Sequence, residues 1–350
     1  MPSFMNRRTL AAAAFILSTL HFAVSTPVFA QAEVVRAGTL EQIRVPGPAL
    51  EGNLEEDPSE RDVFVYLPPG YADGTKRYPV VYFLHGYGVG APIYVNGVLH
   101  LPEAADTALA RGVQDTIVVL PDAFTRYGGS MYSNSPTIGD WESFIAKDLV
   151  GYIDTNYRTL ATRDSRGLSG HSMGGYGTLR IGMKHPEVFG ALYAMSSCCL
   201  MNTAPAQEVV AAQTTRMAAG IEYYLSGSFD NVMQAQAAAW APNPQNAPWY
   251  FDLPFANGVE QPLVQAKWTA NSQLVMVDQH VPALRQYKAI MLDVGDKDGL
   301  AATNADLDAA LTRLGIAHGY EVYDGDHGNR VGTRFIEELL PFFAEHLVAE

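Results

Sequence analysis

The chain has 350 residues, 48% of them hydrophobic, and carries a formal net charge of −14. This acidic balance argues against nucleic acid or an anionic membrane surface as the partner. The length suits one large α/β domain, or one such domain with an insertion.

The first thirty residues have the composition of a signal peptide. Arg7 and Arg8 make the start basic, Leu10–Val24 is apolar and uncharged, and the segment ends at Ala30. The pattern predicts cleavage before Gln31 and export to the periplasm or the outside of the cell. A membrane anchor is the alternative, but the apolar run is short for one. Both the general and the twin-arginine export routes stay open.

Short apolar runs predict the strands of one sheet. The region from Glu33 to Pro46 is strand-like, and the acidic stretch from Gly47 to Glu60 is expected to be a loop. Unbroken apolar runs are typical of strands that are covered on both faces. The further predicted strands are Val63–Leu67, Val80–Leu84, Ile117–Leu120, Arg166–Ser169, Ala191–Met195, Ala289–Val294 and Tyr320–Tyr323.

Helices are expected between most of these strands. The predicted helices are Glu103–Arg111, Asp140–Tyr157 with Asp140 as the N-cap, Gly175–Lys184, Leu300–Leu314 and Thr333–Leu347. Alternation of strands and helices predicts an α/β fold with a mostly parallel central sheet flanked by helices. We expect residues 31–350 to form a single domain of this class.

Residues 200–286 break the alternation. They contain no clear buried strand and are rich in Ala and Gln, which predicts a helical insertion between two late strands. The aromatic side chains of this stretch either line a substrate cleft or pack the insertion onto the sheet, and packing is favoured. They are Tyr223, Tyr224, Trp240, Trp249, Tyr250, Phe251 and Trp268.

A possible nucleophile lies in the pentapeptide GHSMG, residues 170–174. It fits G-x-S-x-G and stands between a predicted strand and a predicted helix, as a nucleophile elbow requires. The flanking glycines are needed because a Cβ at either position would collide across so tight a turn. Ser172 is therefore the predicted nucleophile, and the neighbouring His171 is expected to point down from the elbow.

A serine nucleophile needs a base, and the base needs an acid to orient it. In doubly wound hydrolases the acid and then the histidine follow late strands. His327 is the histidine in the loop after the final strand and is the predicted base. Asp298 is favoured over Asp296 as the acid, and Asp293 is expected to be structural. Asp296 would then cap the helix at Leu300 or face solvent.

Acyl transfer also needs hydrogen-bond donors for the oxyanion. One predicted donor is the backbone N–H of Met173, directly after the nucleophile. The second is the N–H of Tyr87, with Gly86 as the alternative, in the glycine-rich loop that begins at His85. No metal and no organic cofactor is expected.

Cys198 and Cys199 are the two cysteines of the chain and are adjacent. Two small buried side chains are the favoured interpretation. A disulfide between the neighbours is an alternative in an oxidising compartment, where the ring would stiffen the rim of the active site. Two thiols could also bind a metal, but no third ligand is near in the sequence.

Five segments of the chain resemble those of the esterase D-type family of α/β-hydrolases. This family includes feruloyl and acetylxylan-type esterases, siderophore esterases, S-formylglutathione hydrolases and mycolyltransferases. The resemblance implies an α/β-hydrolase fold and triad roles for Ser172, Asp298 and His327. The segments that carry it are Val65–Tyr71, Tyr78–Gly86, Trp141–Ile145, Gly170–Gly175 and Asp293–Asp298.

We therefore expect an exported serine carboxylesterase that hydrolyses small-molecule or carbohydrate esters, such as feruloyl esters, through an acyl-enzyme. The mature chain is expected to have no membrane anchor. An acyltransferase that uses the same triad is one alternative, and an inactive hydrolase-like binding protein is another. The acyl group, the alcohol and the oligomeric state stay open.

Overall fold

The computed structural model describes residues 37–203, 205–218 and 231–350. The predicted signal peptide, residues 1–30, lies outside the described residues, as do Tyr223 and Tyr224. Within the described part, no helix combines the length and the apolar composition needed to cross a bilayer.

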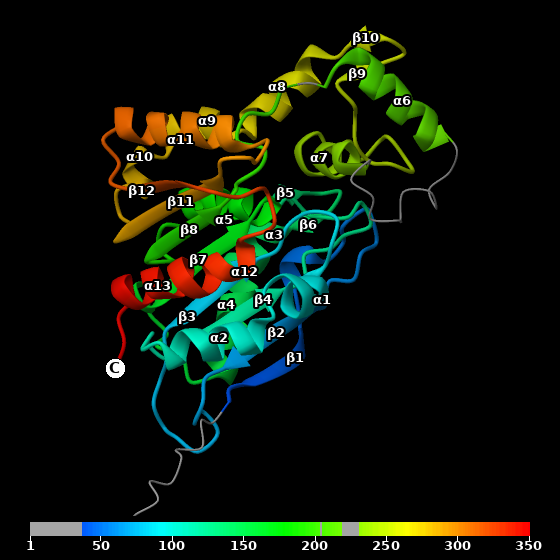
Figure 1. Ribbon diagram of the computed structural model, residues 1–350. Helices are drawn as coiled ribbons and strands as arrows, with labels where there is room; N and C mark the ends of the chain where they lie inside the picture. Colours follow the sequence, from blue (N-terminus) through cyan, green and yellow to red (C-terminus); the bar gives the residue numbers. More distant parts are fainter. Residues whose placement is uncertain (1–36, 204, 219–230) are drawn as a thin grey trace, which may run out of the picture. The chain divides into compact units, whose positions relative to one another are not determined.

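An eight-stranded sheet forms the centre of the molecule, in the order β1-β2-β4-β3-β7-β8-β11-β12 (Figure 1). The strands are β1 (Thr39–Val45), β2 (Arg61–Leu67), β3 (Val80–Leu84), β4 (Ile117–Pro121), β7 (Arg166–His171), β8 (Ala191–Met195), β11 (Ala289–Gly295) and β12 (Gly319–Tyr323). β1 and β2 run antiparallel to their neighbours, and all the other pairs are parallel. This confirms the predicted mostly parallel sheet.

Helices cover both faces of the sheet (Figure 1). One face packs against α2 (Leu101–Ala110), α12 (Val331–Arg334) and α13 (Leu340–His346). The other packs against α4 (Val150–Asn156), α5 (Met173–Lys184) and α11 (Ala301–Arg313). Strand residues alternate between the two cores, as the period of a β-strand requires. The short helix α1 (Ala91–Ile93) follows the β3 loop.

The long helix predicted from Asp140 is interrupted. It begins as α3 (Trp141–Ser143), widens into a π-helical turn at Phe144–Leu149 and continues as α4. Asp140 caps it as expected, since its side chain accepts the Ser143 N–H at 3.0 Å. The buried residues Ile145, Leu149 and Ile153 recur every four positions. On an α-helix, residues four positions apart point in directions that differ by about 40°. The wider π-helical turn offsets this difference and keeps the three side chains on the buried face.

In its described parts, the stretch between β8 and β11 is helical, as predicted for residues 200–286. Its helices are α6 (Gln207–Ala218), α7 (Val232–Trp240), α8 (Pro262–Ala270), α9 (Gln273–Met276) and α10 (Val281–Leu284). It also contains a small antiparallel pair, β9 (Phe255–Ala256) and β10 (Val259–Glu260), which the sequence did not predict. A second such pair, β5 (Asn134–Ser135) and β6 (Gly139–Asp140), precedes α3.

Two tryptophans of the insertion serve packing rather than a cleft. Trp240 and Trp268 are buried and make an edge-to-face pair with ring centroids 5.5 Å apart. Trp240 also packs against Tyr176 of α5 at 5.6 Å. The favoured interpretation is therefore right for these side chains, which fasten α7 and α8 to the helix that follows the elbow.

The junction between β7 and α5 is a sharp turn at Ser172, whose φ is +59°. Few residues with a side chain adopt a positive φ. A Cβ at Gly170 would lie 2.5 Å from the Gly174 carbonyl carbon, and a Cβ at Gly174 would overlap the Leu84 carbonyl oxygen of β3. Both glycines are thus required for the close approach of β3, β7 and α5, as the sequence predicted.

We expect Gly174→Ala to lower the free energy of unfolding by about 1–3 kcal/mol, because the added methyl group displaces the elbow from β3. Gly151→Ala is the matched control: Gly151 lies in α4, and a Cβ there meets nothing within 4 Å. That change should stabilise the protein by about 0.5–1 kcal/mol. Urea unfolding of both variants measures the contrast, and equal stabilities would contradict it.

Candidate active site

The three residues predicted as a triad meet at the carboxyl ends of the parallel strands. Ser172 follows β7, Asp298 follows β11 and His327 follows β12. His327 Nε2 lies 2.9 Å from Ser172 Oγ, and His327 Nδ1 lies 2.8 Å from Asp298 Oδ2. The side chain of Asp298 is 2% exposed and that of His327 is 41% exposed. A buried carboxylate therefore orients a ring that solvent and substrate can reach.

The structure separates the three aspartates near the end of β11. Asp298 accepts the Leu300 N–H on Oδ1 at 2.9 Å and faces His327 with Oδ2. Asp296 is exposed and accepts the Gly325 N–H at 3.0 Å, so its carboxylate anchors the histidine loop. Of the two positions suggested for Asp296, the solvent-facing one is found, and the Leu300 N–H is bound by Asp298 instead.

Asp293 is structural, as expected. It is buried within the sheet, where its Oδ2 accepts hydrogen bonds from Arg334 Nε at 2.6 Å and from the Tyr193 hydroxyl at 2.8 Å. Burial raises the pKa of Asp293, although the Arg334 guanidinium opposes that rise. This carboxylate therefore holds α12 against the sheet.

The two backbone segments predicted to bind an oxyanion lie beside Ser172. Met173 is the first residue of α5, and Tyr87 belongs to the loop after β3. A Cβ at Gly86 would lie 3.4 Å from Ser172 Cβ, which shows how closely this loop passes the nucleophile. Backbone N–H groups at a helix N-terminus and in such a loop suit a developing negative charge.

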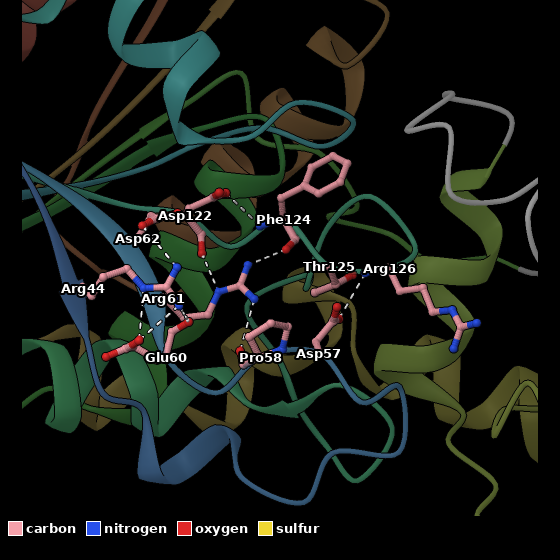
Figure 2. A pocket seen from close by; sticks show the side chains of 10 residues that line it. All are labelled: Arg44, Asp57, Pro58, Glu60, Arg61, Asp62, Asp122, Phe124, Thr125 and Arg126. Carbon is pink, nitrogen blue, oxygen red and sulfur yellow. Dashed lines mark hydrogen bonds and ion pairs between the residues drawn. The ribbon is translucent and has the colours of Figure 1, made fainter.

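A pocket of about 350 Å³, lined largely by charged residues, lies beside the segment that follows β4 (Figure 2). Figure 2 shows Arg61 donating to backbone oxygens, which belong to Pro58, Asp122 and Phe124. Arg61 thereby fixes the segment after β4, whose Ala123 N–H donates to His85 Nε2 at 2.8 Å. His85 Nδ1 in turn donates to the Gly86 carbonyl at 2.8 Å. These hydrogen bonds from Arg61 through His85 thus hold the predicted oxyanion loop in place.

A second histidine contacts the site and was missed as a functional residue. The sequence predicted that His171 would point down from the elbow, and it does, into contact with Tyr94 Oη at 2.7 Å. Its other nitrogen, Nε2, lies 2.7 Å from the carbonyl oxygen of His327. Burial lowers the pKa of His171 to about 3, so the ring is neutral at physiological pH. No sequence pattern marked Tyr94, since it is one apolar residue among many.

Cys198 and Cys199 lie next to the elbow, with their Sγ atoms 2.6 Å apart and no disulfide between them. The Cys198 N–H donates to the Ser172 carbonyl at 3.2 Å. Both cysteines are partly buried. Among the described residues, no group of three or more His, Cys, Asp or Glu side chains is arranged to hold a metal ion.

Comparisons with known proteins identify the family of the chain. The family model described as "Putative esterase" matches residues 56–346. A protein named Esterase MT1326, from Mycobacterium tuberculosis, is 35% identical over 129 residues, which are 35% of this chain and 26% of that protein. An endo-1,4-beta-xylanase/feruloyl esterase from Xylanibacter ruminicola is 34% identical over 132 residues, 36% of this chain and 18% of that protein. The chain thus spans about a quarter or less of these relatives.

Solved structures share the fold. A ferulic acid esterase superposes with a TM-score of 0.63 at 22% identity, covering 89% of this chain and 100% of that one. An S-formylglutathione hydrolase from Staphylococcus aureus superposes with a TM-score of 0.58 at 15% identity, covering 88% and 99%. These likenesses confirm the predicted α/β-hydrolase fold. The family match also confirms the predicted class of enzyme, a hydrolase of carboxylic esters: the chain belongs to the putative esterase family.

Proposed function

We propose that this protein is an exported carboxylesterase that works through an acyl-enzyme on Ser172. The observation that carries the proposal is the continuous hydrogen-bonded line from Asp298 through His327 to Ser172. A serine hydroxyl is a weak nucleophile until a neighbouring base takes its proton, and His327 Nε2 is at the distance that this transfer requires.

The proposed reaction has two halves. Ser172 Oγ attacks the ester carbonyl carbon while His327 Nε2 accepts the hydroxyl proton. The backbone N–H groups of Met173 and Tyr87 stabilise the resulting oxyanion. The C–O bond to the alcohol then breaks, and His327 returns the proton to the departing alcohol. A water molecule, deprotonated by His327, then attacks the acyl-enzyme to form a second tetrahedral intermediate. This intermediate collapses as the bond between the acyl carbon and Ser172 Oγ breaks, His327 returns the proton to Ser172 Oγ, and the acid is released.

The charges around His327 favour this sequence of steps. When His327 accepts a proton it becomes an imidazolium, and the buried carboxylate of Asp298 stabilises that cation at 2.8 Å. The ring of His171 is 4.7 Å away, centroid to centroid. Because burial keeps the pKa of His171 at about 3, this neighbour adds no second positive charge.

We further propose acyl or feruloyl esters of carbohydrates as the substrates. The support is the name of one relative, which is a feruloyl esterase by its title. Such esters occur outside the cell, and the basic, apolar and small-residue pattern of residues 1–30 supports export to reach them. Feruloyl groups are aromatic and acetyl groups are small, so a panel of esters separates these substrates.

Ser172→Ala should lower kcat/KM for p-nitrophenyl acetate by at least about 10³-fold, because no other group can form the acyl-enzyme. The steady release of p-nitrophenol measures this, with the thermal midpoint as the control for folding. If the folded variant hydrolyses the ester as fast as the wild type, the assignment of Ser172 is wrong.

Asp298→Asn should lower kcat by about 10²–10⁴-fold, because the amide no longer stabilises the imidazolium and favours the wrong tautomer of His327. Asp296→Asn is the matched control. Its amide oxygen still accepts the Gly325 N–H, so kcat should stay within about threefold. The reverse ranking of the two variants would make Asp296 the acid.

A panel of methyl ferulate, acetylated sugars and p-nitrophenyl fatty esters tests the substrate class. We expect kcat/KM for feruloyl esters to exceed that for acetyl esters by about tenfold or more, which corresponds to about 1.4 kcal/mol of differential transition-state binding. If cinnamoyl-type esters are cleaved no faster than acetyl esters, the feruloyl preference is contradicted while the esterase assignment stands.

A further inference from the structure

The loop that carries His327 must extend far across the sheet. It leaves β12 at the edge of the sheet, and β8 and β11 separate β12 from β7, which precedes Ser172. Neighbouring strands are about 4.8 Å apart, so the loop and side chain together span about 14 Å. An exposed loop of this kind keeps His327 within hydrogen-bonding distance of Ser172 only if its backbone is held in place.

The first set of anchors comes from the segment directly after β11. The Asp296 carboxylate accepts the Gly325 N–H at 3.0 Å, and the Lys297 N–H donates to the Gly325 carbonyl at 2.9 Å. Both bonds hold a residue two positions before His327. They fix the start of the loop and leave the backbone at His327 itself to be held from elsewhere.

The second anchor comes from β7. His171 Nε2 lies 2.7 Å from the His327 carbonyl oxygen. A carbonyl oxygen only accepts hydrogen bonds, so Nε2 must carry the proton. His171 Nδ1 is then the acceptor in a neutral ring, and the Tyr94 hydroxyl donates to it at 2.7 Å. Both ring nitrogens are thus satisfied within a side chain that is buried.

Tyr94 extends this line to the opposite side of Ser172. A Cβ at Gly86 would lie 2.5 Å from the Tyr94 hydroxyl, so the glycine lets the phenol reach the β3 loop. A hydrogen bond from the Gly86 backbone to this hydroxyl opposes the rise that burial causes in the pKa of Tyr94. One hydrogen-bonded line therefore joins the predicted oxyanion loop to the backbone of the base, beneath the nucleophile.

We infer that His171 is a positioning residue of the esterase reaction: as a neutral N–H donor held by Tyr94, it fixes the backbone of His327 so that the ring meets Ser172. This role rests on the proposed function. His171 touches no substrate and takes no part in proton transfer. It acts through the geometry of His327, where a displacement of about 1 Å is enough to cost about 10²-fold in rate.

Two substitutions at the same position test the donor. His171→Leu removes the N–H, whereas His171→Gln keeps an amide N–H near the position of Nε2. For p-nitrophenyl acetate we expect kcat of His171→Leu to fall by about 10–100-fold with KM within about twofold. His171→Gln should restore kcat to within about fivefold of the wild type. His318→Leu is the control. It removes another histidine, whose side chain is 6% exposed and is hydrogen-bonded to Asp308 at 2.9 Å, and it should leave kcat unchanged.

Tyr94→Phe is the second variant, and it decides the matter if His171→Leu does not fold. Loss of the hydroxyl leaves Nδ1 as a buried acceptor without its donor, so the ring of His171 is no longer held in place, and kcat should fall by about tenfold. Three results would each overturn the inference. They are a folded His171→Leu with wild-type kcat, a His171→Gln as impaired as His171→Leu, and a Tyr94→Phe with unchanged kcat. Ser172→Ala is assayed alongside these variants. An active Ser172→Ala would show that the proposed function is wrong, whereas an inactive one leaves any failure specific to the role of His171.

Discussion

The turn at Ser172 depends on the absence of two side chains. Without a Cβ at Gly170 and Gly174, the backbones of β3, β7 and α5 approach closely enough for the serine to stand at a φ of +59°. The rest of the site is arranged around this turn. The β3 loop passes on one side of the serine, and the Cys198 N–H binds the Ser172 carbonyl at 3.2 Å on the other.

The chemistry is distributed over separate strands, so it depends on the sheet as a rigid frame. The triad residues follow three different parallel strands: Ser172 follows β7, Asp298 follows β11 and His327 follows β12. They are far apart in the sequence and meet only in the folded sheet. The pair formed by Arg334 and the buried Asp293 fastens α12 to the sheet beneath the end of β12. Arg61 of β2 binds the segment after β4, and that segment binds His85 of the loop after β3. These hydrogen bonds fix the positions of α12 and of the segment after β4 relative to the sheet.

Much of this arrangement could be predicted from the sequence. The runs at Val80–Leu84 and Ala191–Met195 are strands with the predicted bounds, because continuous apolar runs leave little choice in a sheet covered on both faces. The meeting of Ser172, Asp298 and His327 also follows from topology, since the carboxyl ends of parallel strands lie at one edge of the sheet. Sequence could rank Asp298 above Asp296, but only the contact at 2.8 Å between Asp298 and His327 distinguishes them.

Other features depend on contacts between distant residues, which no local pattern encodes. His171 and Tyr94 are 77 positions apart, and their bond arises only when β7 packs beside the segment after α1. Two other features likewise depend on packing rather than on local helix or strand propensity. They are the π-helical turn at Phe144–Leu149 and the small β9–β10 pair.

Intact-mass analysis after treatment with an aryl organophosphonate shows whether Ser172 is an activated nucleophile, on which the proposed chemistry depends. Activated serines displace the leaving group of such reagents and keep the phosphonyl group, whereas ordinary hydroxyls do not react. We expect one phosphonyl group per chain, on the peptide that contains residues 170–174. An unmodified protein, or a single adduct on a different residue, would contradict the assignment of Ser172.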